Sequence, residues 1–147
     1  MDPVLDIQRL SIRYAGAPAP AVRDVSFTLG RERLGIVGES GSGKSTVGRA
    51  IMRLLDTAEI TADRMQFEEV DLLNAPEKKM LDVRGKRMSM ILQDPKFSLN
   101  PIQRCGHQIA EAYRTHVKCS KSEARARAIA MLEQVHIRDP ERVYDLY

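Results

Sequence analysis

Tryptophan is absent from this 147-residue sequence, and cysteine and aromatic residues are scarce. Two cysteines, Cys105 and Cys119, are too few for a disulfide framework, which favours a reducing cytoplasm. With aromatic residues at 5%, a platform that stacks nucleic-acid bases is disfavoured. No apolar run approaches the roughly 18 residues of a membrane-spanning helix, and the N-terminus lacks the basic and apolar regions of a signal peptide. These absences argue against a membrane-spanning protein and a disulfide-rich secreted domain.

What the sequence does contain is typical of a globular protein. Hydrophobic residues make up 43% of the chain and charged residues 29%. The length suits one domain of ordinary size. The 23 basic and 20 acidic residues leave a net charge of +3. This modest excess suits an anionic ligand or a membrane surface, and it does not indicate nucleic-acid binding.

Hydrophobic periodicity predicts alternating strands and helices, which places the chain in the α/β class. Strands are expected at residues 4–13, 21–29, 33–37, 64–70 and 87–93, and helices at 44–55, from about 75, at 103–118 and from 120. Residues 56–63 are predicted to be a polar link. The run 33–37 is short, apolar and β-branched, as in a strand that is buried on both faces.

The alternation within residues 4–13 is imperfect. Strict alternation places Leu10 and Ile12 on one face of the strand, and Leu5 and Ile7 on the other. A half-buried strand would keep its large apolar residues on a single face. The segment is still predicted to be a strand, because it is rich in aliphatic residues and is followed by a Gly- and Pro-rich turn.

The two C-terminal helices are predicted from helical spacing. The second one opens with a capping-box pattern, in which Ser120 is followed three residues later by Glu123. Its apolar stripe is Ala124, Ala128, Met131, Leu132 and Val135. In the preceding helix, Ile109, Tyr113 and Val117 share one face.

One motif carries most of the functional information. Residues 38–45 match the pattern G-x-x-x-x-G-K-[ST], between an apolar run and the start of a helix. Glycines there let backbone N–H groups point inward around a phosphate, and the helix N-terminus adds partial positive charge. The predicted nucleotide-binding residues are Gly38, Glu39, Ser40, Gly41, Ser42, Gly43, Lys44, Ser45 and Thr46. Lys44 is expected to reach the β- and γ-phosphates of ATP, and Ser45 to ligate Mg²⁺.

A second motif identifies the type of phosphate loop. The segment 93–101, QDPKFSLNP, begins with Gln93, which lies 49 residues after Lys44 (93 − 44). It resembles the Q-loop of ATP-binding-cassette (ABC) ATPases, and its form is similar to the branch that powers dipeptide, oligopeptide and nickel importers. Residues 84–87 and the phosphate loop also fit that branch. The resemblance extends from Val4 to Tyr147, and it implies an ABC-type P-loop NTPase fold.

The resemblance also implies roles for particular residues. Gln93 and Lys44 would be the catalytic residues, with Gln93 contacting Mg²⁺ or the attacking water. An amide suits that task, because it both donates and accepts hydrogen bonds. Tyr14 would stack on adenine, and Val22 would line the ribose. The Q-loop would contact a coupling helix of a membrane subunit.

By the same resemblance, the chain is one incomplete nucleotide-binding domain. Residues 1–32 would belong to an antiparallel β-subdomain, 33–101 to a RecA-like core and 102–147 to the start of a helical subdomain. The sequence contains no Ser-Gly-Gly signature, no aliphatic strand ending in Asp-Glu and no switch histidine after such a strand. Residues 142–147 resemble the segment that precedes the signature. We therefore expect this chain to bind ATP weakly and not to hydrolyse it by itself.

The absent Asp-Glu strand has a structural consequence. In the family's fold it would lie in the middle of the core sheet, beside the strand that leads into the phosphate loop. Without it, the edges of residues 34–37 and 88–93 are expected to be unpaired, which is a liability for stability and aggregation.

The implied partners are a second nucleotide-binding subunit and transmembrane permease subunits, at the cytoplasmic face of the inner membrane, without nucleic acid. Two other functions stay open. A small-molecule P-loop kinase would use the same loop, but it would also need a second substrate pocket and lid arginines. A nucleotide-binding regulatory module would sequester ATP or pair with a full-length partner.

Two further groups of residues are interpreted as structural or left open. Cys105, His107, His116 and Cys119 have metal-ligating side chains, but the ends of a helix over 103–118 are about 21 Å apart, which is too far to share one ion. Ordinary helix packing is the favoured interpretation. The last helices are basic, with Lys118, Lys121, Arg125, Arg127 and Arg138. This surface is either a solvated face or a contact with a partner or anionic lipid.

Overall fold

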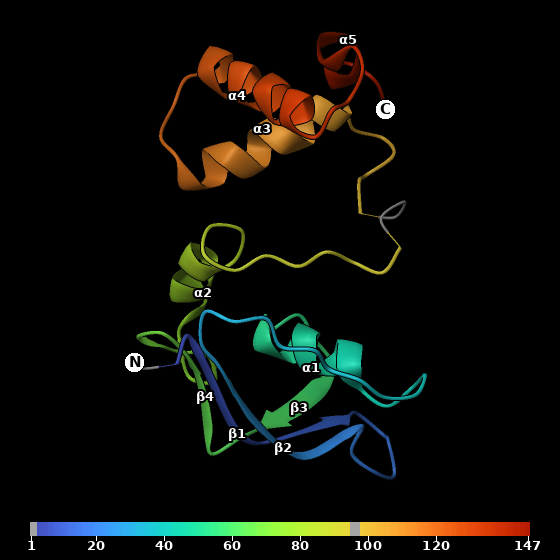
Figure 1. Cartoon of the computed structure of the whole chain (residues 1–147), viewed down its shortest axis with the longest axis vertical. Coiled ribbons are helices and arrows are strands. Elements are labelled where there is room, and N and C mark those ends of the chain that lie inside the picture. The colour runs from blue at the N-terminus through green and yellow to red at the C-terminus, as the bar shows by residue number, and fades with distance from the viewer. Residues whose placement is uncertain (1–2, 95–97) are drawn as a thin grey trace. The chain divides into compact units, whose positions relative to one another are not determined.

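The computed structural model describes residues 3–94 and 98–147, and the chain forms two compact units, Met1–Arg84 and Gly85–Tyr147 (Figure 1). The strands are β1 (Leu5–Tyr14), β2 (Val22–Leu29), β3 (Ala58–Thr61), β4 (Arg64–Phe67) and β5 (Val70–Asp71). The helices are α1 (Lys44–Ile51), α2 (Glu77–Val83), α3 (Cys105–His116), α4 (Lys121–Gln134) and α5 (Pro140–Tyr144). All five strands, α1 and α2 lie in the first unit, and α3 to α5 lie in the second.

Strand β1 is the centre of an antiparallel sheet. Along one edge it pairs with β2. On the other edge its first half pairs with β4, which continues into β5, and its second half pairs with β3. The strands predicted at 4–13 and 21–29 are confirmed. The single strand predicted at 64–70 is instead two short antiparallel strands, β4 and β5, because the chain turns at Glu68, which has φ = 47°. Strand β3 was not predicted, because it lies within the expected polar link.

A bulge in β1 explains the imperfect alternation in its sequence. Arg9 adopts φ = 50°, and the pairing with β2 shifts register between Ile7 and Leu10. An extra residue in one strand reverses the face to which later side chains point. As a result Leu5 and Ile7 before the bulge, and Leu10 and Ile12 after it, are all buried. The bulged amide of Arg9 donates to the hydroxyl of Ser26 at 2.9 Å.

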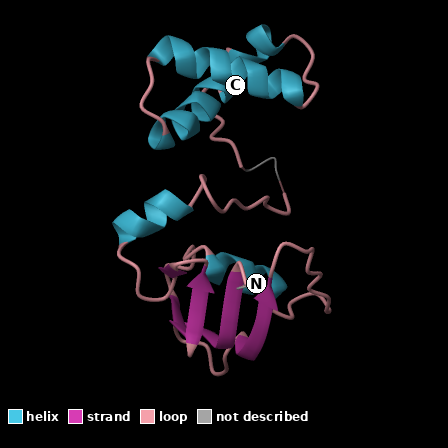
Figure 2. Ribbon diagram, turned by 60° about the vertical axis from the view of Figure 1, so that its left-hand side comes forward, coloured by secondary structure: helices cyan, strands magenta, loops and turns pink. Residues whose placement is uncertain are grey.

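Helix α1 lies along one face of this sheet (Figures 1 and 2). Its buried residues are Val47, Ala50 and Ile51. The helix is shorter than the predicted 44–55, because Arg53 adopts a left-handed conformation with φ = 52° that ends it. Burial of the apolar stripe fixes the helix against the sheet and so fixes where its N-terminus lies.

The C-terminal end of α1 is tied to α2 through Arg84. Its Nε donates to the carbonyl of Met52 at 2.8 Å, and a terminal nitrogen donates to that of Arg53 at 3.2 Å. The other terminal nitrogen pairs with Glu77 at 2.5 Å. These bonds satisfy carbonyl groups that the end of a helix leaves without partners. The helix predicted from about residue 75 is confirmed as α2.

Two predicted strands do not form. Residues 33–37 and 87–93 are outside any strand, and Val37 and Ile91 are 96% and 94% exposed. An apolar strand needs partners on both edges for its N–H and C=O groups, and cover on both faces. Among the described residues, the strands pair only with one another in the N-terminal sheet. The apolar composition was interpreted as a buried strand, but nothing in the described chain buries it.

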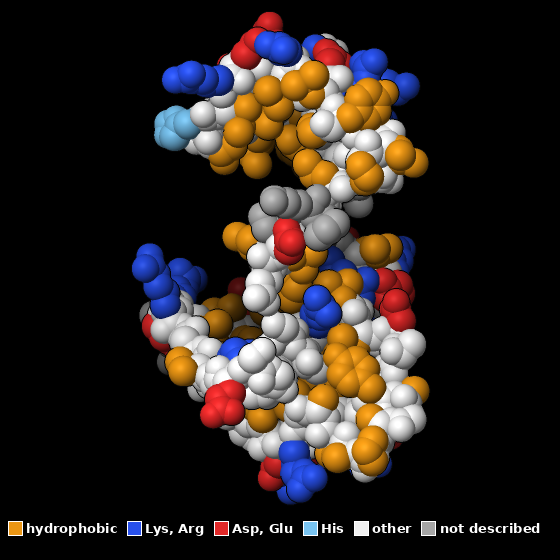
Figure 3. All heavy atoms as spheres, turned by 90° about the vertical axis from the view of Figure 1, so that its right-hand side faces the viewer, with side chains coloured by type: hydrophobic (Ala, Val, Ile, Leu, Met, Phe, Trp, Pro, Cys, Tyr) orange, Lys and Arg blue, Asp and Glu red, His pale blue; other side chains and the backbone are white. Residues whose placement is uncertain are grey.

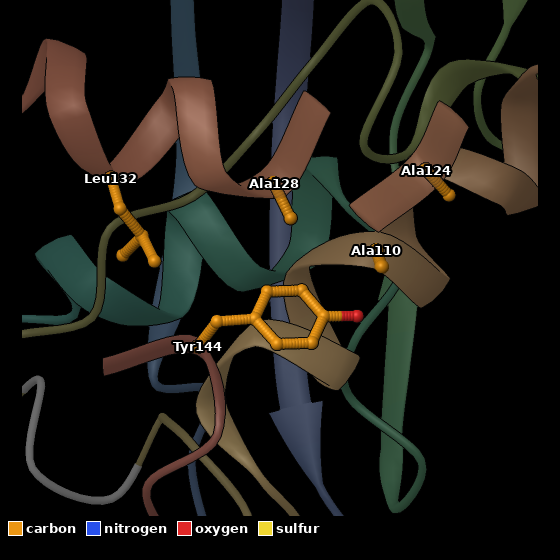
Figure 4. Close-up of a cluster of buried hydrophobic side chains, with 5 residues drawn as sticks. All are labelled: Ala110, Ala124, Ala128, Leu132 and Tyr144. Carbon is orange, nitrogen blue, oxygen red and sulfur yellow. The ribbon is translucent and has the colours of Figure 1, made fainter. Parts of the chain in front are cut away.

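The second unit is a helical hairpin, α3 and α4, closed by the short α5. The predicted capping box is confirmed: the amide of Glu123 donates to the Ser120 hydroxyl at 3.1 Å, and the amide of Ser120 donates to the Glu123 carboxylate at 2.7 Å. The buried cluster consists of Ala110, Ala124, Ala128, Leu132 and Tyr144 (Figure 4).

Tyr144 holds α5 against the hairpin. Its ring fills the space left by the absent side chain of Gly106, so a Cβ there would lie 2.1 Å from the ring. The Arg125 guanidinium stacks over the ring at 4.1 Å from its centroid, and the His107 ring meets it edge-on at 5.4 Å. Next to the tyrosine, Asp145 pairs with Arg104 at 3.1 Å and with Arg125 at 3.3 Å.

The predicted stripe of α4 is only partly buried. Ala124, Ala128 and Leu132 are buried, whereas Met131 is 44% exposed and Val135 65% exposed. The helix presents one side to α3 and α5, and no further element among the described residues covers the other. No helix in the described part of the chain is long and apolar enough to cross a membrane.

Replacing Gly106 by alanine is expected to destabilise the helical unit. The added methyl group would overlap the Tyr144 ring and lie 2.7 Å from its Cα. Such overpacking costs roughly 1–3 kcal/mol, because ring and backbone must both shift. The measurement is urea unfolding followed by circular dichroism at 222 nm. Gly35→Ala is the matched control, since nothing lies within 4 Å of a Cβ at that position; equal loss in both variants would contradict the prediction.

Acid is expected to destabilise the chain partly through Glu123. The backbone N–H and the hydroxyl of Ser120 hold the pKa of the Glu123 carboxyl below its usual value. A carboxyl with a lowered folded-state pKa contributes stability above its unfolded pKa, and this is lost as pH falls through the folded value. The free energy of unfolding should therefore fall less between pH 6 and 3 for Glu123→Gln than for the unmodified chain. Parallel pH profiles would exclude this contribution.

Candidate nucleotide-binding site

The predicted phosphate loop leads directly into α1. Gly43 is the N-cap residue, with φ = 90°, and no side chain caps the helix there. The first backbone N–H groups of an α-helix have no partner within the helix. Together with the helix dipole, these groups form an anion-binding site. Gly41 also has a positive φ of 81°, which allows the preceding chain to fold back.

Lys44 lies inside this loop. Its Nζ donates to the carbonyls of Gly38 and Glu39 at 2.8 and 2.5 Å, and to the hydroxyl of Ser42 at 3.2 Å. The ammonium group thus holds the two ends of the loop together from within. A phosphate oxygen is a stronger acceptor than a neutral carbonyl, so the same group can turn toward a bound triphosphate.

The loop is seated on the start of β2. A Cβ at Gly43 would lie 2.8 Å from the carbonyl oxygen of Ala21 and 2.9 Å from a methyl group of Val22. Only glycine fits this contact, in both conformation and size. Val22 itself is 5% exposed. The contact places the predicted ribose-lining residue directly against the phosphate loop.

Tyr14 comes to the same region from the end of β1. Its hydroxyl lies 3.4 Å from that of Thr46 in the first turn of α1. The end of β1, the start of β2 and the start of α1 therefore converge, although Tyr14 and Thr46 are 32 residues apart in sequence. The predicted residues Tyr14, Val22 and 38–46 are together in the first unit, while their contacts with a nucleotide stay predictions.

Ser45 and Gln93 are the predicted Mg²⁺ ligands. Ser45 is exposed in the first turn of α1, next to Lys44. Gln93 is exposed in the second unit, and residues 95–97 of the predicted Q-loop lie outside the described residues. In the described ranges, no three His, Cys, Asp or Glu side chains are grouped so that they could hold a metal ion.

One residue of the site was missed by the sequence analysis. The carbonyl of Ala21 shapes the seat for Gly43, but a backbone contact between segments 22 residues apart has no signature in sequence. The glycine itself was found, because the motif requires it. The structure adds a second reason why residue 43 must be glycine: the start of β2 approaches it too closely for a Cβ.

Comparison with known proteins agrees with this geometry. The family model described as ABC transporter matches residues 22–146, which include the phosphate loop and Gln93. The chain belongs to the ABC transporter family. Three similar proteins of this family cover nearly the whole chain.

The first of these relatives is the probable D,D-dipeptide transport ATP-binding protein DdpD of Escherichia coli K12, 43% identical over 99% of this chain and 46% of that protein. The dipeptide transport ATP-binding protein DppD of Haemophilus influenzae is 41% identical over 98% of this chain and 45% of that protein. The oligopeptide transport ATP-binding protein OppD of Bacillus subtilis is 43% identical over 95% of this chain and 40% of that protein. The chain spans less than half the length of these curated relatives. The predicted family and the α/β ABC fold class are confirmed.

Replacing Gly43 by alanine is expected to disrupt the phosphate loop of this ABC domain. Alanine would be strained at φ = 90° and would meet the Ala21 carbonyl at 2.8 Å. Affinity for a fluorescent ATP analogue should fall about tenfold or more, since misplaced N–H groups no longer converge on phosphate. Gly35→Ala, which adds the same methyl group in open space, should bind as the unmodified chain does. Unchanged binding by Gly43→Ala would show that the β2 contact does not shape the site.

Proposed function

We propose that this chain is the ATP-binding portion of an energy-coupling subunit of an ABC importer for peptides. The observation that carries the proposal is the phosphate loop, with Lys44 at an uncapped helix N-terminus that is seated on the sheet. The names of the quoted relatives, which refer to dipeptide and oligopeptide transport, support the substrate class. Nickel, which the sequence resemblance also allowed, has no such support from these three names.

In this function, the first turn of α1 and Lys44 bind the triphosphate. Lys44 exchanges its bonds to the carbonyls of Gly38 and Glu39 for bonds to phosphate oxygens, so the same ammonium group that holds the loop together also binds the nucleotide. The donor set fits Mg²⁺ as well, because the Ser45 hydroxyl is exposed beside Lys44. When bound, Mg²⁺ neutralises charge on the phosphate oxygens.

The residues around the loop would bind the rest of the nucleotide. Tyr14, at the end of β1, offers an aromatic ring for the adenine face. Its hydroxyl is within hydrogen-bonding distance of the Thr46 hydroxyl, at 3.4 Å. Val22 offers an apolar surface toward the ribose. Gln93, in the second unit, would orient the attacking water through its amide.

The same proposal includes the partners. A second nucleotide-binding subunit and transmembrane permease subunits would complete the transporter, with this chain at the cytoplasmic face of the membrane. ATP hydrolysis belongs to the assembled protein. The 147-residue chain is expected to bind ATP weakly, because residues 33–37, which lead into the loop, are exposed and outside any strand. It is expected not to turn ATP over, because its sequence contains no Ser-Gly-Gly signature and no strand ending in Asp-Glu.

Lys44→Ala is expected to reduce ATP binding by this chain about tenfold or more, since a charge-assisted hydrogen bond to phosphate is lost. The measurement is titration with a fluorescent ATP analogue, with and without Mg²⁺, beside a coupled assay for phosphate release. Lys78→Ala on α2 is the matched control, because it removes an equal charge from an exposed position outside the loop.

Three outcomes would overturn parts of the proposal. Equal ATP affinity of Lys44→Ala and the unmodified chain would remove the assigned site. Clear Mg²⁺-dependent turnover by the 147-residue chain, abolished by Lys44→Ala, would contradict its expected inactivity. Transfer of phosphate to an acceptor other than water would favour a kinase.

A further inference from the structure

A cavity between α3 and α4 reaches down to Tyr144 of α5. Its volume is about 590 Å³, within the range of roughly 300–1,000 Å³ that is typical of small-molecule sites. Its base consists of Ala110, Ala124 and Tyr144, which belong to the buried cluster (Figure 4). The polar residues of its wall are His107, Glu111 and Arg114 from α3, and Lys121, Ser122 and Arg125 from α4. The cavity thus combines an apolar base with a mainly cationic wall.

The positive side chains of the wall are not neutralised by the chain itself. In the part of the chain that the structure describes, neither Arg114 nor Lys121 forms an ion pair. Arg125 pairs with Asp145 at 3.3 Å, but this carboxylate also pairs with Arg104, at 3.1 Å. One negative charge is therefore divided between two guanidinium groups.

Negative charge in the cavity is limited to one side chain. Among the described lining residues, only Glu111 is acidic, and it forms no ion pair within the described ranges. Glu123, on the same helix turn as Lys121, accepts hydrogen bonds from the backbone N–H and the hydroxyl of Ser120. Three cations thus face one carboxylate, and the wall of the cavity has a net positive charge.

These cations converge on one space. Lys121 and Arg125 are four residues apart on α4, so they are neighbours on one side of the helix, where like charges repel each other. Arg114 lines the same cavity from α3. Figure 3 shows Lys and Arg side chains at separate positions on one face of the helical unit, where each is solvated alone. An anion bound between the three cations of the cavity would relieve their repulsion.

Arg125 is held in position without a ligand. Its guanidinium stacks over the Tyr144 ring at 4.1 Å from the centroid, and one terminal nitrogen donates to Asp145 at 3.3 Å. A guanidinium group has five N–H donors, so this bond leaves others for a ligand. The hydroxyl of Ser122 is a further donor in the wall. A side chain that is already fixed loses little freedom on binding, which favours affinity.

The donors fit a phosphate monoester better than a carboxylate. A phosphate monoester carries about 1.5 to 2 negative charges at neutral pH and has three acceptor oxygens. A carboxylate carries one charge on two oxygens. Arginine and lysine both bind phosphate oxygens through charge-assisted hydrogen bonds. Three cations can each bind one oxygen of a phosphate group, whereas a single carboxylate leaves at least one of them without a partner.

We propose that this cavity binds a phosphate monoester, either as a free small molecule or as the headgroup of a lipid. Arg114, Lys121 and Arg125 bind the phosphate oxygens, and the apolar base contacts the carbon atoms next to the ester. No residue of the phosphate loop takes part, so the inference does not depend on the proposed function. It gives the basic surface of the last helices, which the sequence left open, a specific ligand.

The test uses glycerol phosphate as the free ester and phosphatidic acid as the lipid. Because the phosphate loop also binds phosphate, all measurements use the 147-residue chain carrying Lys44→Ala. Isothermal titration calorimetry measures the affinity for glycerol phosphate. Co-sedimentation compares phosphatidylcholine vesicles that contain phosphatidic acid with vesicles that contain phosphatidylglycerol, a phosphate diester, at equal surface charge.

Four variants assign the binding to the cavity. Arg114→Gln and Lys121→Gln should each weaken it about tenfold, because a charge-assisted hydrogen bond is lost. Glu111→Gln should strengthen it about threefold, because a repelling carboxylate is removed. Arg127→Gln is the matched control: it removes an equal charge from α4, but it lines a separate apolar groove on the other side of the hairpin. All four side chains are exposed, so the variants are expected to fold, which circular dichroism would establish.

Two results would support the proposal and distinguish the source of the phosphate. Binding of glycerol phosphate with this pattern of variants, and no preference between the vesicles, would identify a free ester. Preference for phosphatidic acid over phosphatidylglycerol, with the same pattern, would identify a lipid headgroup. Raising the salt concentration should weaken either interaction.

Four results would overturn the proposal. They are no binding of either probe, an equal loss in Arg127→Gln and Arg114→Gln, equal binding of both vesicle types without binding of glycerol phosphate, and tighter binding of a glutamate-rich peptide than of either phosphate probe. The last would make the ligand an acidic protein segment. Since the Lys44→Ala chain is used throughout, these results are separate from the ATP titration, and either experiment can fail while the other stands.

Discussion

The contact between Gly43 and the start of β2 is the constraint on which the site depends. The loop can approach the Ala21 carbonyl and the Val22 side chain because residue 43 has no Cβ and adopts a positive φ. That approach fixes the first turn of α1, whose free N–H groups point out of the helix end. Burial of the α1 stripe against the sheet holds the other end of the arrangement. Without the contact between Gly43 and the start of β2, the position of Lys44 relative to Tyr14 would not be fixed.

The two units bury their cores in different ways. The N-terminal unit buries its core by saturating both edges of β1, and it uses a bulge to bring four aliphatic side chains to the interior. The buried cluster of the C-terminal unit consists of three alanines, Leu132 and Tyr144. Its other face keeps an apolar groove with a positive rim. One face of the hairpin is thus closed by Tyr144 and α5, and no element among the described residues covers the other.

Much of the fold could be predicted, and the exceptions share a cause. The capping box, helix α2 and the long strands depend on local residues, so sequence patterns find them. Strand β3 was missed because it is held by pairing with a distant part of β1. Residues 33–37 were expected to form a strand because they are apolar, yet a strand also needs neighbours. In the site, the motif residues were found, whereas the Ala21 contact was not.

The sequence alone determined the family, the phosphate-loop motif and the order of most elements, because motif spacing and periodicity are local properties of the chain. Only the tertiary structure decided which apolar segments are buried. Leu10 and Val37 are both aliphatic residues in predicted strands, but one is fully buried and the other 96% exposed. The difference lies in their neighbours: β1 has a partner on each edge and α1 above it, and residues 33–37 have neither among the described residues. Burial is a property of what surrounds a segment, and a single segment's sequence does not contain it.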